Sequence, residues 1–238
     1  MTSEELRKNI LSTYFTLRLG IVVLSIGLPI VLYVVGMLWG GIPTLLDSMS
    51  AYYGANDFAM RNWFVGGLWT IGWFLYLYKG FSTLENVLLN LAGGFAVAVA
   101  MLPCNCWPPH ATNNKLHVIA AVSFFVSMAL VCFFCAKDTI KLLPPDKRDA
   151  FRNQYHGITI ALIVSPAAAV FVSFFLRQLD QYKFFIEAFG VWVFGYYWLT
   201  KSREFKITAA EKRALRGELT NLKGQGVVPI QALGPPAG

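Results

Sequence analysis

Six long stretches of apolar residues divide this chain, and they constrain its fold more than any other feature. A helix needs about 20 mostly apolar residues to cross the hydrocarbon core of a bilayer. The second, third and sixth stretches are somewhat shorter and extend readily by a few residues. We therefore expect an all-α fold, a polytopic transmembrane helical bundle with six spans. The predicted spans are Leu19–Trp39, Trp63–Tyr78, Val87–Leu102, Leu116–Ala136, Gly157–Leu176 and Phe184–Thr200.

The composition favours a membrane protein for the same reason. Hydrophobic residues make up 56% of the chain and charged residues only 14%, whereas about a quarter of the residues in a soluble domain are charged. Aromatic residues reach 15%, and membrane proteins place Trp and Tyr at both bilayer interfaces. We expect a multi-pass protein of the plasma (inner) membrane.

The basic residues predict the orientation of the spans. The segments 1–18, 79–86, 137–156 and 201–238 alternate with the other loops and hold most of the Lys and Arg residues. The opposite side keeps only four of them, and cytoplasmic segments are the ones that carry excess positive charge. Both termini are therefore expected in the cytoplasm. The four basic residues expected outside are Arg61, Lys115, Arg177 and Lys183.

Three regions follow from this topology: an amphipathic N-terminus over residues 1–18, a transmembrane domain over 19–200, and a basic cytoplasmic tail over 201–238. Thr208 as the N-cap and Glu211 three residues later form a capping-box pattern that predicts a short helix with a basic face. Such a face suits the anionic lipids of the inner leaflet, so membrane lipids are expected partners. Gly and Pro dominate after about residue 223, which predicts disorder.

Other partners are constrained less. The net charge of +7 does not indicate nucleic acid, because the chain has no RNA- or DNA-binding motif. A homo-oligomer or another membrane protein as partner stays open.

Polar residues gather in the predicted outer loops. In the loop after the first span, Asp57 and Arg61 stand four residues apart and would share one face of a helix. The alternative is an interfacial helix with an aromatic belt and a capping ion pair. The candidate outer site consists of Ser48, Ser50, Tyr52, Asp57, Arg61, His110, His117 and Glu187.

Two of these candidates lie at the outer ends of spans. Ionisable residues within membrane helices are rare and commonly functional, which gives weight to His117 and Glu187. A carboxylate at that depth is costly unless it is paired, and Arg61, His117 and Arg177 are the expected partners of Glu187. A purely structural ion pair is the alternative.

Cysteine and histidine suggest a metal site without completing one. Cys104 and Cys106 form a CxC pair and the two nearby histidines stand seven apart, spacings that match no common zinc site. His156 lies on the other side of about 30 Å of hydrocarbon, which excludes a three-histidine centre in this topology. We expect no metal and no cofactor.

Several patterns carry a resemblance. Ser48-x-Ser50-x-Tyr52-Tyr53, Arg61-Asn-x-Phe-Val-Gly, Gly72-x-Phe-Leu-x-x-Tyr78-Lys-Gly80 and Glu85-Asn resemble those of an uncharacterised family of bacterial six-span integral membrane proteins, which implies a membrane location.

A fainter resemblance is to the superfamily of alkaline ceramidases and adiponectin-type receptors. Its members use Ser, Asp and three His at a membrane-embedded zinc. A Ser, Asp57 and His117 match that set. The six spans, the absence of His-x-x-x-His in the last span and the position of His156 depart from it.

Three functions remain open from the sequence. The first is a binding, sensory or assembly component that uses the outer polar residues for recognition. The second is a membrane-embedded lipid hydrolase or lipid-modifying enzyme that uses Asp57, His117 and Glu187. The third is a small transporter or an oligomeric channel.

Overall fold

The computed structural model describes residues 1–102, 104, 115–176, 182–222 and 226–233, and nearly all of its ordered elements are helices. Each of the six predicted stretches is helical, so that part of the prediction is confirmed. The six long helices are α1 (Ser3–Leu38), α3 (Arg61–Leu77), α4 (Thr83–Met101), α5 (Lys115–Leu130), α7 (Pro145–Phe175) and α8 (Lys183–Thr208).

Within the described residues, four helical segments are long and apolar enough to cross a membrane: Ser3–Leu38, Thr83–Met101, Lys115–Ile140 and Pro145–Val172. The third of these joins α5 to α6 (Ala136–Ile140) through one π-helical turn, Val131–Cys135. The other two long helices are not in this group: α3 has only 17 residues, and the apolar part of α8 is interrupted by Glu187 and by Gly, Tyr and Trp residues.

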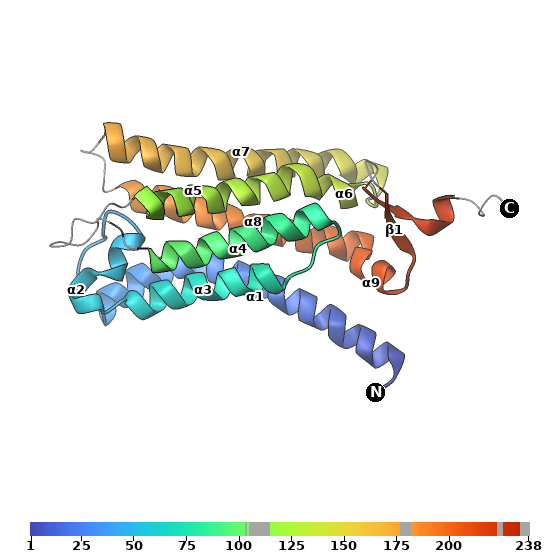
Figure 1. Cartoon of the computed structure of the whole chain (residues 1–238), viewed down its shortest axis with the longest axis horizontal. Helices are drawn as coiled ribbons and strands as arrows, with labels where there is room; N and C mark the ends of the chain where they lie inside the picture. The colour runs from blue at the N-terminus through green and yellow to red at the C-terminus, as the bar shows by residue number, and fades with distance from the viewer. Residues whose placement is uncertain (103, 105–114, 177–181, 223–225, 234–238) are drawn as a thin grey trace.

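The long helices lie side by side along the long axis of the molecule (Figure 1). Packing runs from α1 to α3, α4, α5, α7 and α8 and then back to α1, so the bundle is a closed ring. Small residues allow the closest contact. A Cβ atom on Gly93 of α4 would lie 2.6 Å from the carbonyl oxygen of Gly72 on α3, so the two backbones touch there.

Large apolar side chains also cover the outside of the bundle. Val23, Ile160, Phe174 and Phe189 are all at least half exposed, although a soluble protein rarely exposes a large contiguous apolar surface. Together with the four long apolar helices, this exterior is compatible with a helical membrane protein.

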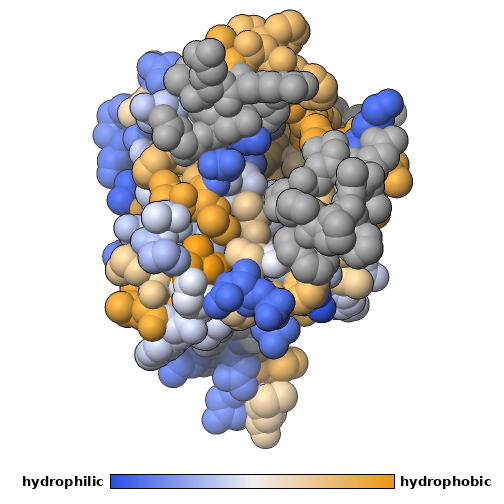
Figure 2. All heavy atoms as spheres, turned by 90° about the vertical axis from the view of Figure 1, so that its left-hand side faces the viewer, coloured by the Kyte–Doolittle hydropathy of each residue, from blue (hydrophilic) through white to orange (hydrophobic). Residues whose placement is uncertain are grey.

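The two ends of the bundle differ, and we name them by what they carry. The loop end holds residues 39–60 with the short helices η1 (Ser50–Tyr53) and α2 (Ala55–Phe58), and also the starts of α5 and α8. Figure 2 looks onto this end, where hydrophilic and hydrophobic residues lie next to one another. The tail end is the opposite one, where α8 ends and the first turns of α1 project beyond the bundle (Figure 1).

The tail end is closed by a folded segment that we call the tail cap, residues 209–222 and 226–233. It contains α9 (Ala210–Leu215), η4 (Ile230–Leu233) and an antiparallel hairpin of β1 (Leu219–Leu222) and β2 (Gly226–Pro229). We expected disorder from about residue 223, whereas the structure describes residues 226–233 as β2 and η4. Val227 is buried and Asn221 donates a hydrogen bond to the Phe81 carbonyl at 2.7 Å, so the hairpin is docked on the bundle.

Candidate functional site at the tail end of the bundle

The predicted outer residues mostly hold the loop end together. The Glu187 carboxylate accepts a hydrogen bond from the Met49 backbone N–H at 2.7 Å, and the Phe184 N–H donates to the Asp47 carbonyl at 2.8 Å. These two bonds fix residues 47–53 on the first turn of α8. Glu187 is therefore bonded to a backbone amide and interacts electrostatically with Lys183, whereas we had expected it to pair with Arg61, His117 or Arg177. One of the expected partners, Arg177, lies outside the described residues.

The serine and tyrosine candidates serve the same loop. The Ser48 hydroxyl accepts from the Ala51 N–H at 3.2 Å and lies 3.3 Å from the Ser50 hydroxyl. The Tyr52 hydroxyl accepts from the Leu46 N–H at 3.5 Å. Burial raises the pKa of this tyrosine above its usual value, so Tyr52 stays protonated through the physiological range.

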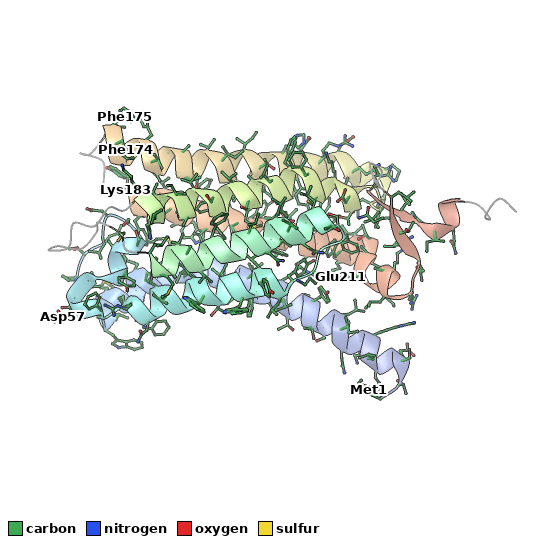
Figure 3. The ribbon with its side chains drawn as sticks, viewed as in Figure 1. Met1, Asp57, Phe174, Phe175, Lys183 and Glu211 are labelled. Carbon is green, nitrogen blue, oxygen red and sulfur yellow. The ribbon has the colours of Figure 1, made fainter. Side chains whose placement is uncertain are left out.

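Asp57 and Arg61 do not form the predicted pair. Asn56, Asp57 and Phe58 all have positive φ angles, so the chain turns here in the left-handed region and does not continue as a helix. The Arg61 guanidinium instead lies 3.5 Å from the centre of the Phe58 ring, as a cation–π contact. Asp57 is exposed at the edge of the loop end (Figure 3).

His117 is also bonded to the backbone. Its Nδ1 lies 3.0 Å from the Leu102 carbonyl oxygen, which ties the start of α5 to the end of α4. Cys104 is disulfide-bonded, while His110 and Cys106 lie outside the described residues. Within the described part of the chain, no group of three or more His, Cys, Asp or Glu residues is placed to hold a metal ion.

The described candidates of the loop end are thus bonded mainly to the backbone around them. Among the described contacts, no hydrogen bond or ion pair joins any two of Asp57, His117 and Glu187. Recognition of a ligand by the loop end stays a prediction.

The tail end contains a buried charged cluster that the sequence did not lead us to expect. Lys201 and Glu204 on α8 are 1% and 0% exposed. The Lys201 Nζ donates to the Thr139 hydroxyl of α6 at 2.7 Å and lies 3.5 Å from the Glu204 carboxylate. The Tyr155 hydroxyl of α7 donates to the same carboxylate. We call Thr139, Tyr155, Lys201 and Glu204 the tail-end network.

A second carboxylate, Glu85, adds negative charge beside this network. Glu85 is 2% exposed, accepts from the Phe81 N–H at 2.8 Å, and interacts electrostatically with Lys201 and Glu204. Gly80 provides the space for it, since a Cβ atom there would lie 2.2 Å from the Glu85 carboxyl carbon. The Tyr-Lys-Gly and Glu-Asn elements of the sequence pattern therefore form one tight loop at the tail end.

One buried polar atom of the cluster lacks a hydrogen-bond partner. Glu204 Oε1 is buried and has no hydrogen-bond partner among the described residues. Buried polar atoms are nearly always hydrogen-bonded, and exceptions commonly mark strain, function or a bound water or ion. An ion pair buried at such cost contributes little net stability, so the network is a strong candidate for a functional element.

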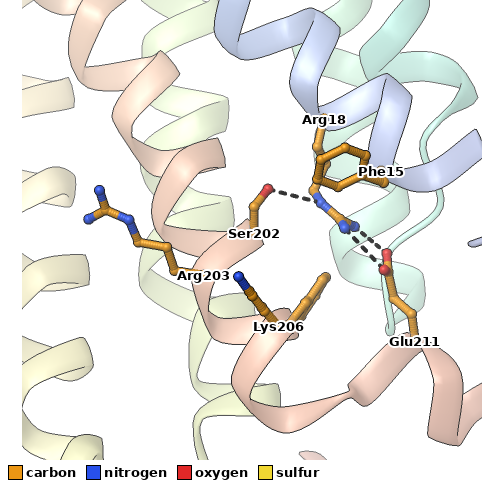
Figure 4. A pocket seen from close by; sticks show the side chains of 7 residues that line it. Phe15, Arg18, Ser202, Arg203, Lys206 and Glu211 are labelled. Carbon is orange, nitrogen blue, oxygen red and sulfur yellow. Dashed lines mark hydrogen bonds and ion pairs between the residues drawn. The ribbon is translucent and has the colours of Figure 1, made fainter. Parts of the chain in front are cut away.

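A further buried ion pair joins the cap to the first helix. Arg18 is 3% exposed, and its guanidinium binds the Glu211 carboxylate of α9 through both terminal nitrogens. Its Nε donates to the Ser202 hydroxyl of α8 at 3.1 Å, and a terminal nitrogen lies 3.4 Å from the Tyr78 hydroxyl. The predicted role of Glu211 in a capping box is therefore replaced by a tertiary contact (Figure 4).

No family model, no curated protein and no solved structure matches this chain.

Proposed function

We propose that this chain is a six-span protein of the plasma membrane with both termini in the cytoplasm, and that it acts as a sensory component. In this proposal the loop end recognises a ligand outside the cell, and the tail cap responds inside it. The first turns of α1 and the tail cap lie at the same end of the bundle (Figure 1), as an even number of spans requires. Most basic residues also belong to that end, which supports a cytoplasmic location.

The observation that carries the proposal is the continuity of α8. Glu187 near its start holds residues 47–53, while Lys201 and Glu204 near its end belong to the tail-end network. The helix has no break between them, and its rise places Glu187 and Glu204 about 26 Å apart. A ligand that shifts α8 at the loop end would therefore disturb the tail-end network, whose buried side chains have few alternative hydrogen-bond partners. This disturbance would also reach the tail cap.

The alternatives have less support. A hydrolase requires a nucleophile, a base and an orienting group in mutual reach, whereas Asp57, His117 and Glu187 are each engaged elsewhere or exposed. A transporter requires polar groups along the membrane interior, and the buried charged residues of the described chain gather at the tail end.

Hydrogen–deuterium exchange on the purified full-length protein tests this proposal. Glu187→Ala should release residues 47–53 and also increase exchange in the tail cap. Asp57→Ala is the matched control, because it removes a carboxylate from the same end that has no ion-pair partner among the described residues. A change confined to the loop end in Glu187→Ala would contradict the sensory function.

The orientation has its own test. A cysteine introduced at Lys147 should resist a membrane-impermeant maleimide in intact cells, while one introduced at Asp57 should react. The reverse pattern would place the tail cap outside and would remove the basis of the proposal.

A further inference from the structure

A small pocket opens between α1 and α8 beside the Arg18–Glu211 ion pair (Figure 4). Its volume is about 350 Å³. Both helices contribute, and α9 closes one side. The lining residues are Phe15, Arg18, Ser202, Arg203, Phe205, Lys206 and Glu211.

The charges of this pocket favour an anion. Arg18 is neutralised by Glu211, which leaves the positive charges of Arg203 and Lys206. Within the described residues neither of these two side chains forms an ion pair, and both are exposed. Both line the pocket and stand three apart on α8; in Figure 4 the Lys206 amine lies nearer to Ser202, while the Arg203 guanidinium extends away from Arg18. Two such cations together with the Ser202 hydroxyl suit a phosphate group.

The surroundings of the pocket favour a lipid as the source of that phosphate. Phe15 is 54% exposed at its edge. Leu19 and Val23 continue this exposed apolar surface along α1 at one-turn spacing, with Val23 60% exposed. Leu19 is also the first residue of the predicted first span. The pocket therefore lies where a headgroup meets the start of the acyl chains, with an apolar path leading from it.

We propose that this pocket binds the phosphate headgroup of an anionic phospholipid of the cytoplasmic leaflet. Arg203 and Lys206 contact the phosphate, and Phe15 packs against the glycerol and the first acyl carbons. The inference rests on the proposed function in one respect, which is the placement of the tail end at the cytoplasmic leaflet. Anionic lipids are concentrated in that leaflet and attract basic residues near its surface.

Native mass spectrometry of the full-length protein in detergent tests the proposal with phosphatidylglycerol and phosphatidylcholine as probes. We expect the wild-type chain to retain phosphatidylglycerol in preference to phosphatidylcholine. Arg203→Gln/Lys206→Gln should reduce phosphatidylglycerol binding by at least about fivefold. The matched control is Arg7→Gln/Lys8→Gln, which removes two exposed cations of the projecting part of α1 and should leave binding unchanged.

Three outcomes would overturn the pocket as a lipid site. Equal loss in both double variants would show general charge attraction. Equal retention of phosphatidylcholine would remove the requirement for an anionic headgroup. Displacement of phosphatidylglycerol by an equal concentration of inorganic phosphate would assign the pocket to a free anion.

The measurement does not depend on orientation, because detergent exposes both ends of the protein. Lipid binding together with an outward-facing Lys147 would contradict the proposed function while supporting the pocket. If Lys147 is cytoplasmic but phosphatidylglycerol does not bind selectively, the pocket proposal fails and the proposed orientation stands. The substituted side chains are exposed, and unchanged thermal unfolding of each variant verifies that the fold is intact.

Discussion

Arg18 of the first helix and Glu211 of the tail cap form a two-pronged ion pair although 193 residues separate them in the chain. The pair is largely buried, with 4% of the Arg18 side chain and 17% of the Glu211 side chain exposed. It therefore stabilises the fold more than a surface salt bridge would, since water screens the two charges only in part. It fixes α9, and through α9 the hairpin, on the bundle.

Arg18→Gln should release the tail cap. The substitution leaves the Glu211 carboxylate without its cation, and we expect a loss of roughly 1–3 kcal/mol of stability. Hydrogen–deuterium exchange should increase in residues 209–222. Arg7→Gln, on the exposed part of the same helix, should change neither quantity, and unchanged exchange in Arg18→Gln would show that the pair does not hold the cap.

Lys201→Met should destabilise the fold by about 3–5 kcal/mol, because it leaves Glu204 buried without a counter-charge. The free energy of unfolding in detergent measures this loss. Lys206→Met on the exposed face of the same helix is the control and should stay within about 0.5 kcal/mol of the wild type.

A double-variant cycle asks whether Lys201 and Glu204 act as one unit. Lys201→Met/Glu204→Gln should lose less stability than the two single changes added together, since the second removes the charge that the first left unpaired. Strict additivity would mean that the two side chains are energetically independent.

Gly80→Ala should disturb the Glu85 loop. Its Cβ atom would lie 2.2 Å from the Glu85 carboxyl carbon, so that side chain must move, at a cost of about 1–3 kcal/mol. Gly66→Ala is the matched control, because no atom lies within 4 Å of the corresponding Cβ position. Equal thermal unfolding of the two variants would contradict the close packing at Gly80.

Two adjacent glycines of α4 test the contact between α3 and α4. Gly93→Ala should lower the unfolding temperature, because its Cβ atom would meet the backbone of Gly72, whereas Gly94→Ala faces open space. Alanine favours a helix over glycine in water by about 1 kcal/mol, so Gly94→Ala should be neutral or stabilising. A loss at Gly94 that equals the loss at Gly93 would mean that this crossing is not close.

Long apolar stretches were sufficient to predict the helices. Backbone groups in an apolar environment must be bonded within the segment, and all six predicted stretches are helical. The predicted ends of the helices differed more from the structure. The first helix runs back to Ser3, so the predicted amphipathic N-terminus and the first span are one continuous helix.

The candidate site was harder to predict because its members come from separate helices. Lys201 and Glu204 look like ordinary residues of a basic tail, and only the packing of α8 against α6 and α7 places Thr139 and Tyr155 around them. Their i, i+3 spacing was the available signal, since it puts opposite charges on one face. The hairpin was missed because short apolar segments between glycines and prolines resemble disordered sequence.

The most direct test of the coupling through α8 is its reciprocity. If the loop end and the tail cap are coupled thermodynamically, a change at either one must alter the other. Hydrogen–deuterium exchange of residues 47–53 should therefore increase in Glu204→Gln, although this position is about 26 Å from Glu187 along the helix. It should stay unchanged in Glu218→Gln, which alters a carboxylate in the tail cap outside the network. Wild-type exchange at residues 47–53 in Glu204→Gln would contradict the account.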